Sequence, residues 1–291
     1  RGAVGVFLDG DDAPPFLIRK ADGAFLYATT DLATIQWRLE HWKPDRILYV
    51  VDHRQGQHFK HLFETVHRWG LSGVELVHVA FGTVLGEDGR PFKTRAGDTV
   101  GLESLLDEGV ERAAAVVAAA GREGMDDATK KQVAETVGIG AIKYADLSQN
   151  RTTDYVFSFD KMLELKGNTA AYMQYAVARV EGIATKGEVD IQSLRSSPPP
   201  IHLREPQERA LALAIARYAE VLEDVEGDYR PNLLTAWLYD VAGRFSVFYD
   251  ALPVLKAEGD VRASRLALCD LTGRVLRHGL GLLGIGAVQR M

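Results

Sequence analysis

The sequence contains almost no cysteine and no long hydrophobic run. Its single cysteine, Cys269, excludes an internal disulfide and is typical of proteins from a reducing compartment. No apolar stretch approaches the length of a membrane-spanning helix, about 18 residues, and no signal peptide opens the sequence. We therefore expect a globular protein in the cytoplasm with no membrane partner. A length of 291 residues suits two domains or one large one.

An excess of positive charge is also missing. The sequence has 34 Lys and Arg residues and 40 Asp and Glu residues, so its formal net charge is −6. This charge argues against bulk attraction to nucleic acid. From Asp160 onward, however, 16 basic residues face 17 acidic ones, so this half can still form a local basic patch. Composition alone does not predict an RNA partner.

The first part of the chain alternates between strand-like and helical segments. Residues 2–8, 15–20 and 25–30 are predicted as short strands. A helix follows over residues 31–43, with Thr30 or Asp31 as its N-cap. The continuous apolar run at 46–52 is typical of a buried parallel strand.

A second helix, which ends near Gly70, and a strand over residues 74–84 continue this alternation. The order predicts a parallel α/β sheet, in which ligands bind at the carboxyl ends of the strands. Asp31 and Gln55 both lie just after predicted strands. The sequence therefore predicts a ligand pocket beside these two residues.

The remainder of the chain is predicted to be helical. The three prolines of Ser196–Pro200 indicate a loop, and the domain boundary is placed within residues 160–167. The expected fold is an incomplete, Rossmann-like α/β domain over residues 1–160, followed by an all-α bundle over residues 161–291. The predicted helices cover residues 102–120, 127–147, 206–222, 231–249 and 261–282.

Two short segments carry side chains that suit the recognition of an arginine. A carboxylate such as Asp31 pairs with a guanidinium through two parallel hydrogen bonds. Tyr27 offers a hydroxyl or a ring face to the same group, and Gln55 offers an amide. The alternative from the residues alone is that Asp31 only caps a helix, Tyr27 is half-buried and Gln55 lies in a solvated loop.

The loop from Arg90 to Gly97 is short, basic and ends in glycine. Lys93 and Arg95 suit charge neutralisation on a polyphosphate as pyrophosphate leaves. A solvated basic hairpin is the alternative. Upstream, His78 and Phe81 belong to a strand-like segment, and from the residues alone a buried histidine beside a core phenylalanine explains them.

In this order, the motifs resemble the catalytic domain of the arginyl-tRNA synthetases, which are class I aminoacyl-tRNA synthetases. The resemblance implies that Tyr27, Asp31 and Gln55 contact arginine and that Lys93 and Arg95 are catalytic. Phe92-Lys93-Thr94-Arg95 stands where the family motif is Lys-Met-Ser-Lys, which leaves open which cation acts on the phosphates. The implied ATP contacts are His58, His78, Phe81, Gly82, Phe92, Lys93 and Thr94.

The second half resembles the α-helical anticodon-binding domain of the same family. The segment Gly167–Tyr175 matches the opening of that domain, and its two tyrosines lie three residues apart on one helix face. Aromatic rings commonly stack on unpaired RNA bases, although core packing is the alternative fate of these rings. Arg151 is implied to contact the tRNA backbone, and a salt bridge to Asp154 or another acidic residue is the alternative. The implied tRNA contacts are Tyr172, Tyr175, Tyr249, Met291 and Arg151.

One class I motif is missing, because no H-x-G-H occurs in the 291 residues. In the family this motif lies upstream of the point where the sequence starts, at a helix that meets the triphosphate. The sequence also starts at Arg1 rather than at a methionine. We therefore expect an amino-terminal truncation, and very poor activation of arginine by this piece alone.

The resemblance implies an arginine–tRNA ligase that joins arginine to ATP, releases pyrophosphate and transfers arginine to its tRNA. Catalysis then rests on positioning and charge stabilisation without a protein nucleophile. The expected partners are ATP, with Mg²⁺ bound through its phosphates rather than at a protein metal site, arginine and arginine tRNA. A monomer is expected. The alternatives are a non-catalytic tRNA-binding or regulatory relative, and a small arginine-binding protein fused to a helical interaction domain.

Overall fold

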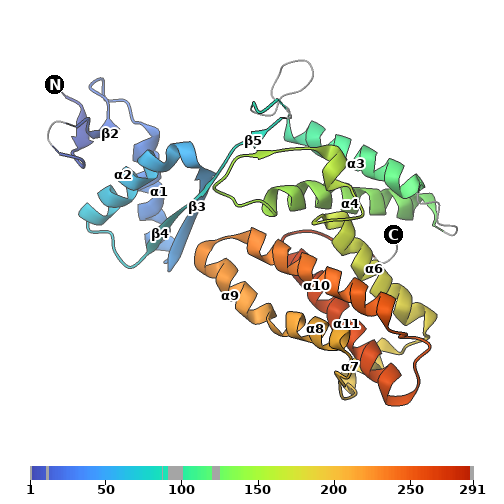
Figure 1. Cartoon of the computed structure of the whole chain (residues 1–291). Coiled ribbons are helices and arrows are strands. Elements are labelled where there is room, and N and C mark those ends of the chain that lie inside the picture. Colours follow the sequence, from blue (N-terminus) through green and yellow to red (C-terminus); the bar gives the residue numbers. More distant parts are fainter. Residues whose placement is uncertain (1, 11–12, 87, 91–100, 120–124, 289–291) are drawn as a thin grey trace. The chain divides into compact units, whose positions relative to one another are not determined.

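The computed structural model describes residues 2–10, 13–86, 88–90, 101–119 and 125–288 (Figure 1). The chain forms two compact units. Unit 1 comprises residues 1–83 and 152–154, and unit 2 comprises residues 84–151 and 155–291. The chain therefore passes between the units after residues 83, 151 and 154. No helix within the described ranges is long and apolar enough to cross a membrane.

Unit 1 begins with an antiparallel pair, β1 (Val4–Val6) and β2 (Phe16–Arg19), followed by helix α1 (Tyr27–His41). The predicted strand over residues 25–30 is wrong, since Phe25 forms only an isolated bridge with Arg19 and the helix already starts at Tyr27.

The threonines explain this difference. Their branched side chains favour a strand, but here they bond to the backbone. The Thr29 hydroxyl accepts the N–H of the helix cap Leu26 at 3.4 Å, and the Thr30 hydroxyl donates to the Tyr27 carbonyl at 2.8 Å. The N-cap is therefore Leu26, neither Thr30 nor Asp31.

Strands β3 (Arg46–Asp52) and β4 (Glu75–Phe81) lie on either side of α2 (Gly56–Arg68) in the sequence. They pair in parallel from Arg46 opposite Glu75 to Asp52 opposite Phe81, which confirms the predicted parallel sheet. A short 3₁₀ turn, η1 (His53–Gln55), leads from β3 into α2.

The predicted strand over residues 74–84 is wrong at its end, where the chain leaves β4 at Gly82. A Cβ at Gly82 would lie 2.6 Å from the Thr153 carbonyl oxygen, so only glycine allows this close approach. The next N–H, of Thr83, donates to the Asp154 carboxylate at 2.6 Å. Residues 152–154 are thereby held against the end of β4.

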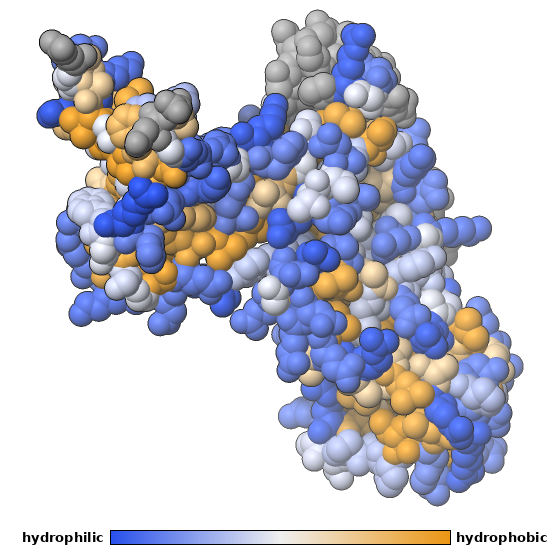
Figure 2. Space-filling model, turned by 60° about the vertical axis from the view of Figure 1, so that its left-hand side comes forward, coloured by the Kyte–Doolittle hydropathy of each residue, from blue (hydrophilic) through white to orange (hydrophobic). Residues whose placement is uncertain are grey.

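The core of unit 1 lies between its two helices and the inner face of β3 and β4. The outer face of β3 carries exposed residues, among them Val50, whose exposed fraction is 64%. Figure 2 shows hydrophobic residues at the surface among hydrophilic ones. The buried core side chains are Phe16, Ala28, Leu32, Ile35, Phe59, Leu62 and Val66.

Unit 2 opens with β5 (Val84–Leu85), which pairs in parallel with β6 (Tyr155–Val156). Helices α3 (Leu102–Ala119) and α4 (Asp127–Leu147) pack closely on each other. Their backbones approach at glycines, since a Cβ on Gly138 would lie 2.6 Å from the Gly109 carbonyl oxygen.

The other helices of unit 2 form the predicted all-α bundle. The predicted single helix over residues 206–222 is wrong, since it divides at Arg217 into α8 and α9. The Trp237 indole donates to the Ala214 carbonyl at 2.8 Å, and a continuous helix would need that acceptor for the Tyr218 N–H. These helices are α5 (Phe159–Met162), α6 (Ala170–Lys186), α7 (Ile191–Ser196), α8 (Pro206–Ala216), α9 (Tyr218–Asp228), α10 (Pro231–Ala251) and α11 (Gly259–Leu282).

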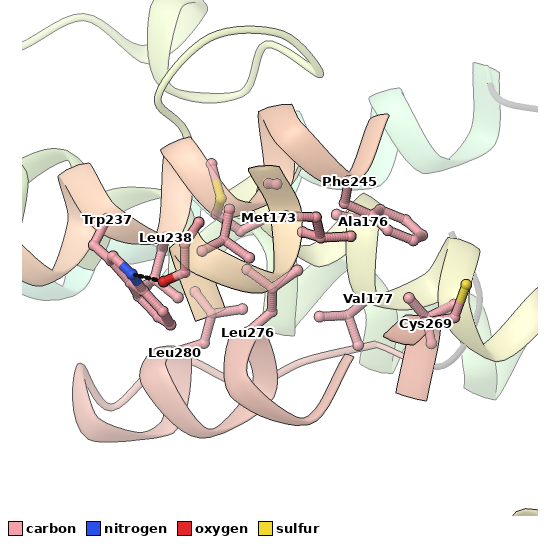
Figure 3. Packing of buried hydrophobic residues seen from close by; sticks show 14 of the residues in the cluster. Met173, Ala176, Val177, Trp237, Leu238, Phe245, Cys269, Leu276 and Leu280 are labelled. Atoms are coloured by element: carbon pink, nitrogen blue, oxygen red, sulfur yellow. Dashed lines mark hydrogen bonds between the residues drawn. The ribbon is translucent and has the colours of Figure 1, made fainter. Parts of the chain in front are cut away.

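The bundle core is built mainly from α6, α10 and α11. Figure 3 shows Met173 and Val177 from α6 among Leu238 from α10 and Leu276 and Leu280 from α11. The same region buries Cys269, whose thiol pKa rises to about 12, chiefly through burial. This thiol therefore stays protonated and unreactive near neutral pH.

Candidate functional site

Three of the predicted ligand residues meet in unit 1, at the start of α1. Tyr27 is the first residue of the helix and Asp31 lies one turn later, so both occupy one helix face. Asp31 does not follow a strand, contrary to the sequence-based expectation. The His58 Nε2 of α2 donates to its carboxylate at 2.8 Å, and the Tyr27 and His58 ring centroids lie 4.8 Å apart.

His58 is nearly buried, whereas Asp31 and Tyr27 are open to solvent. His58 is 11% exposed, packed by the rings of Phe16 and Phe59, whereas 35% of the Asp31 side chain and 68% of Tyr27 are exposed. A well-packed histidine therefore orients a carboxylate that still faces solvent. The open carboxylate and ring face together suit a cationic, planar ligand group.

The loop between β3 and α2 is fixed by a charged pair that the sequence analysis did not single out. Arg54 donates to both carboxylate oxygens of Asp52, at 2.9 and 2.7 Å, and the Arg54 N–H bonds to the same carboxylate. These bonds hold the pKa of Asp52 well below its usual range. The Asp-x-Arg spacing at the end of a strand is the sequence signal for such a turn. The pair places Gln55, which is exposed, at the N-terminus of α2.

The two strand ends also meet at this edge of the sheet. The His53 ring nitrogen lies 3.2 Å from the Phe81 carbonyl oxygen, so the loops after β3 and β4 are joined. Phe81 is exposed here, and Gly82 follows it. His78 lies deeper, where its Nε2 is 3.0 Å from the Val51 carbonyl and its ring is 4.6 Å from that of Phe59.

Tyr49 on β3 is a further polar residue that sequence reasoning missed. Its hydroxyl is buried, and this burial raises the pKa of Tyr49, although the Arg38 guanidinium opposes the rise. The nearby Asp31 carboxylate adds to this rise. No sequence signal marks this hydroxyl, because Tyr49 reads as one more apolar residue of a buried strand.

Four of the predicted site residues lie outside the described residues, namely Phe92, Lys93, Thr94 and Arg95. The same holds for Met291. In the part of the chain that the structure describes, no group of three His, Cys, Asp or Glu side chains is placed to hold a metal ion.

In unit 2, two of the three predicted tyrosines flank one arginine. The Arg179 guanidinium carbon lies 4.9 Å from the ring centroid of Tyr175 and 5.4 Å from that of Tyr249. Tyr172 contacts α10 through Tyr239 and Ser246. We call Tyr172, Tyr175, Arg179 and Tyr249 the tyrosine cluster. Sequence reasoning missed Arg179, which the i, i+4 spacing from Tyr175 would have indicated.

Arg151 lies elsewhere in unit 2, where it donates to the carbonyls of Tyr229 and Asp228 at 3.0 and 3.2 Å. It thus satisfies carbonyl groups at the C-terminus of α9.

The segment after α11 is held against α4 and α6. Lys143 donates to the Gly284 carbonyl at 2.7 Å, and the buried Gln174 donates to the Gly286 carbonyl at 2.8 Å. Ala287 of this segment packs in the same cluster as Tyr172 and Tyr249. Residues 284–287 are therefore held against the bundle.

Residues 1–159 match the family model described as tRNA synthetases class I (R), catalytic domain. The chain belongs to the class I arginyl-tRNA synthetases. Residues 173–291 match a second family model, the DALR anticodon binding domain. The predicted fold class, a class I catalytic part followed by a helical anticodon-binding domain, is confirmed.

Related arginyl-tRNA synthetases match along the whole chain. The arginine–tRNA ligases of a Picosynechococcus species and of Rhodopirellula baltica are each 50% identical to it, over 301 and 304 residues. These alignments cover 100% of this chain but 51% and 45% of the two relatives. The chain thus spans about half the length of the curated relatives it matches.

Solved structures of the family agree. The Thermus thermophilus arginyl-tRNA synthetase superposes with a TM-score of 0.87 at 26% identity, covering 100% of this chain and 54% of that one. The Plasmodium falciparum enzyme superposes with a TM-score of 0.84 at 27% identity, covering 100% of this chain and 50% of that one.

Proposed function

We propose that the protein containing this chain is an arginine–tRNA ligase, and that this chain supplies part of the arginine and ATP site together with the anticodon-binding domain. The observation that carries the proposal is the Asp31 carboxylate, oriented by His58 beside the open ring of Tyr27. This arrangement lies within residues 1–159, which match the catalytic domain of the family.

Asp31 binds the arginine guanidinium in this proposal. The His58 N–H bonds to one carboxylate oxygen, which leaves the other free to accept from the ligand. Tyr27 covers one face of the guanidinium, and Gln55 bonds to a polar group of the amino acid. Neutral amino acids lack the charge that Asp31 needs, and therefore bind poorly.

ATP binds beside the carboxyl ends of β3 and β4, where Phe81, Gly82 and His78 border the base, together with His58, Phe92, Lys93 and Thr94. Lys93 and Arg95 neutralise the phosphates while the arginine carboxylate attacks the α-phosphate and pyrophosphate leaves. Mg²⁺ arrives with ATP, bound through the phosphates. The chain's own contribution is positioning and charge.

The helical domain holds the anticodon loop of arginine tRNA. Support comes from the tyrosine cluster, whose half-buried rings and central guanidinium suit stacking on unpaired bases. We assign Tyr172, Tyr175, Tyr249 and Met291 to this loop, and Arg151 to the tRNA backbone. We also propose a domain boundary at residue 160, a monomeric full-length protein and a cytoplasmic location.

Two measurements test the proposal. The full-length protein, incubated with ATP, arginine and arginine tRNA, is expected to form arginyl-tRNA, and replacement of arginine by lysine should abolish charging. The 291-residue chain is expected to bind arginine tRNA more tightly than an anticodon-altered copy at one fixed salt concentration. Failure to charge arginine would refute the ligase function, and equal binding of the two tRNAs would refute anticodon reading.

A further inference from the structure

Helices α8 and α10 run side by side in unit 2 (Figure 1). A pocket of about 460 Å³ on the surface is lined by residues of both helices. Leu213 and neighbouring alanines provide its apolar lining. Four arginines and a single acidic residue supply the charged lining, namely Arg204, Arg209, Arg217, Arg244 and Asp240. This concentration of guanidinium groups contrasts with the net charge of −6 of the whole chain.

The acidic partners leave the pocket positive. Asp240 accepts from Arg244 at 2.8 Å, and Glu220 pairs only loosely with Arg217, at 3.4 Å on an exposed surface. Among the described residues, no partner is found for the side chains of Arg204 and Arg209. Two guanidinium groups are therefore available to a ligand.

Glu208 does not neutralise the pocket, although it lies between these arginines in the sequence. Its carboxylate is buried and bonds to Arg265 at 2.7 Å. It also accepts the backbone N–H groups of Arg204 and Glu205, at 2.8 and 2.9 Å. The buried carboxylate thus fixes the backbone at the start of α8 and holds the Arg204 main chain at the pocket rim.

Guanidinium groups that line a surface pocket suit phosphate groups, which arginine binds through two parallel hydrogen bonds. We propose that this pocket binds backbone phosphates of the tRNA, at a site separate from the tyrosine cluster; the inference rests on the proposed function. Asp240 and Arg244 of α10 line the pocket beside α8, whereas Tyr239 and Ser246 of α10 contact α6. One RNA molecule contacts both sides of α10.

The test measures binding of the 291-residue chain to arginine tRNA and to its anticodon-altered copy over a range of salt concentrations. Arg204→Ala and Arg209→Ala should each weaken binding of both RNAs equally, on the order of tenfold, and lower the salt slope by about 1. Arg209→Lys should retain most of the slope, because the charge remains. Arg274→Ala, an exposed arginine of α11 outside the pocket, is the matched control and should change neither quantity.

The outcomes separate this inference from the proposed function. If the folded Arg204→Ala/Arg209→Ala double variant has the same tRNA affinity and salt slope as the parent chain, the phosphate-binding proposal is refuted. Anticodon discrimination by the parent chain is a separate result and would still stand. A loss of affinity for the unaltered tRNA alone would also refute the phosphate-binding proposal, because contacts to phosphates do not depend on base sequence. If the parent chain binds neither RNA, both the proposed tRNA binding and the phosphate-binding proposal are refuted. Circular dichroism establishes that each variant is folded.

Discussion

The Asp31 carboxylate is held in place by the protein and is still open to solvent. One oxygen bonds to His58, which is itself packed between aromatic rings, and the carboxylate remains partly exposed. A group that is oriented before the ligand arrives loses little freedom on binding. The carboxylate is therefore suited to select for charge as well as for shape.

Asp31→Asn in the full-length protein should raise the KM for arginine. The substitution removes a charge-assisted pair, which is worth about 1.5–3 kcal/mol, and so predicts a rise of roughly ten- to 150-fold. Steady-state charging at varied arginine concentration measures this. Asp45→Asn, an exposed position ahead of β3, is the control. Unchanged arginine kinetics would remove Asp31 from the pocket.

Tyr249→Ala should weaken tRNA binding by about 1–3 kcal/mol, the range for loss of one base–aromatic stack. Arginine-dependent steps measured without tRNA should change little, because Tyr249 belongs to the helical domain. Tyr249→Phe retains the ring and should bind nearly as the parent does. Equal tRNA binding by the alanine variant would mean that Tyr249 serves only in packing.

At the level of elements, the close approach of α3 and α4 depends on glycine. Gly138→Ala places a Cβ 2.6 Å from a backbone oxygen and 2.7 Å from the Val110 Cα, so the helices must separate. We expect a loss of stability of about 1–3 kcal/mol, measured by urea unfolding.

Gly182→Ala is the matched control for this element. Gly182 lies within α6, and an added Cβ would meet no atom within 4 Å outside the local helix backbone, so alanine should raise stability by about 0.5–1 kcal/mol. A Gly138→Ala variant as stable as Gly182→Ala would contradict the close packing of α3 on α4.

The Glu208–Arg265 pair should make the stability of the helical bundle depend on pH. Burial raises the pKa of Glu208, but hydrogen bonds from the Glu205 and Arg204 backbone and from Arg265 outweigh it, so the folded pKa lies below 4.5. The ionised Glu208 carboxylate therefore contributes its full stabilisation above about pH 4.5. This stabilisation is lost as the pH falls through the folded pKa of Glu208.

Glu208→Gln tests this dependence. It removes the carboxylate charge, leaves the buried Arg265 without its acidic partner, and should cost roughly 3–5 kcal/mol at pH 7. The difference from the parent should shrink on acidification below pH 4.5, as thermal unfolding at several pH values would measure. Glu108→Gln, on an exposed pair with Arg112, should change stability by less than about 1 kcal/mol. A pH-independent difference would refute the linkage.

Sequence patterns predicted elements well where one influence dominates. The apolar run of β3 and the periodic helix α4 match their predicted bounds, residues 46–52 and 127–147. The start of α1 was missed because the threonine side chains bond to the helix backbone. The division of α8 from α9 depends on Trp237, which lies far along the sequence.

Site residues, too, were predictable from local sequence but not where they depend on tertiary packing. The resemblance supplied Tyr27, Asp31 and His58 as separate positions, but not the hydrogen bond that joins two of them. Arg179 among the tyrosines was accessible from its spacing. The convergence of Arg204, Arg209 and Arg244 was not, because it requires the packing of α8 on α10.

For the whole molecule, local charge matters more than net charge. A net charge of −6 does not attract RNA to the chain as a whole. The proposed RNA binding therefore requires local surfaces where the acidic residues are paired with arginine or buried. Beside the pocket between α8 and α10, Asp240 is paired with Arg244, and Glu208 is buried and paired with Arg265. RNA binding by this chain should therefore be steeply salt-dependent despite its acidic composition.

The return of residues 152–154 to unit 1 has a consequence for dividing the protein. A piece that ends at residue 83 lacks Thr153 and Asp154, which close over Gly82 and Thr83. Residues 1–83 and 84–291, produced as separate polypeptides, thus carry complementary halves of one contact. The chain is in this sense a natural candidate for fragment complementation, in which reassembly of unit 1 requires both pieces.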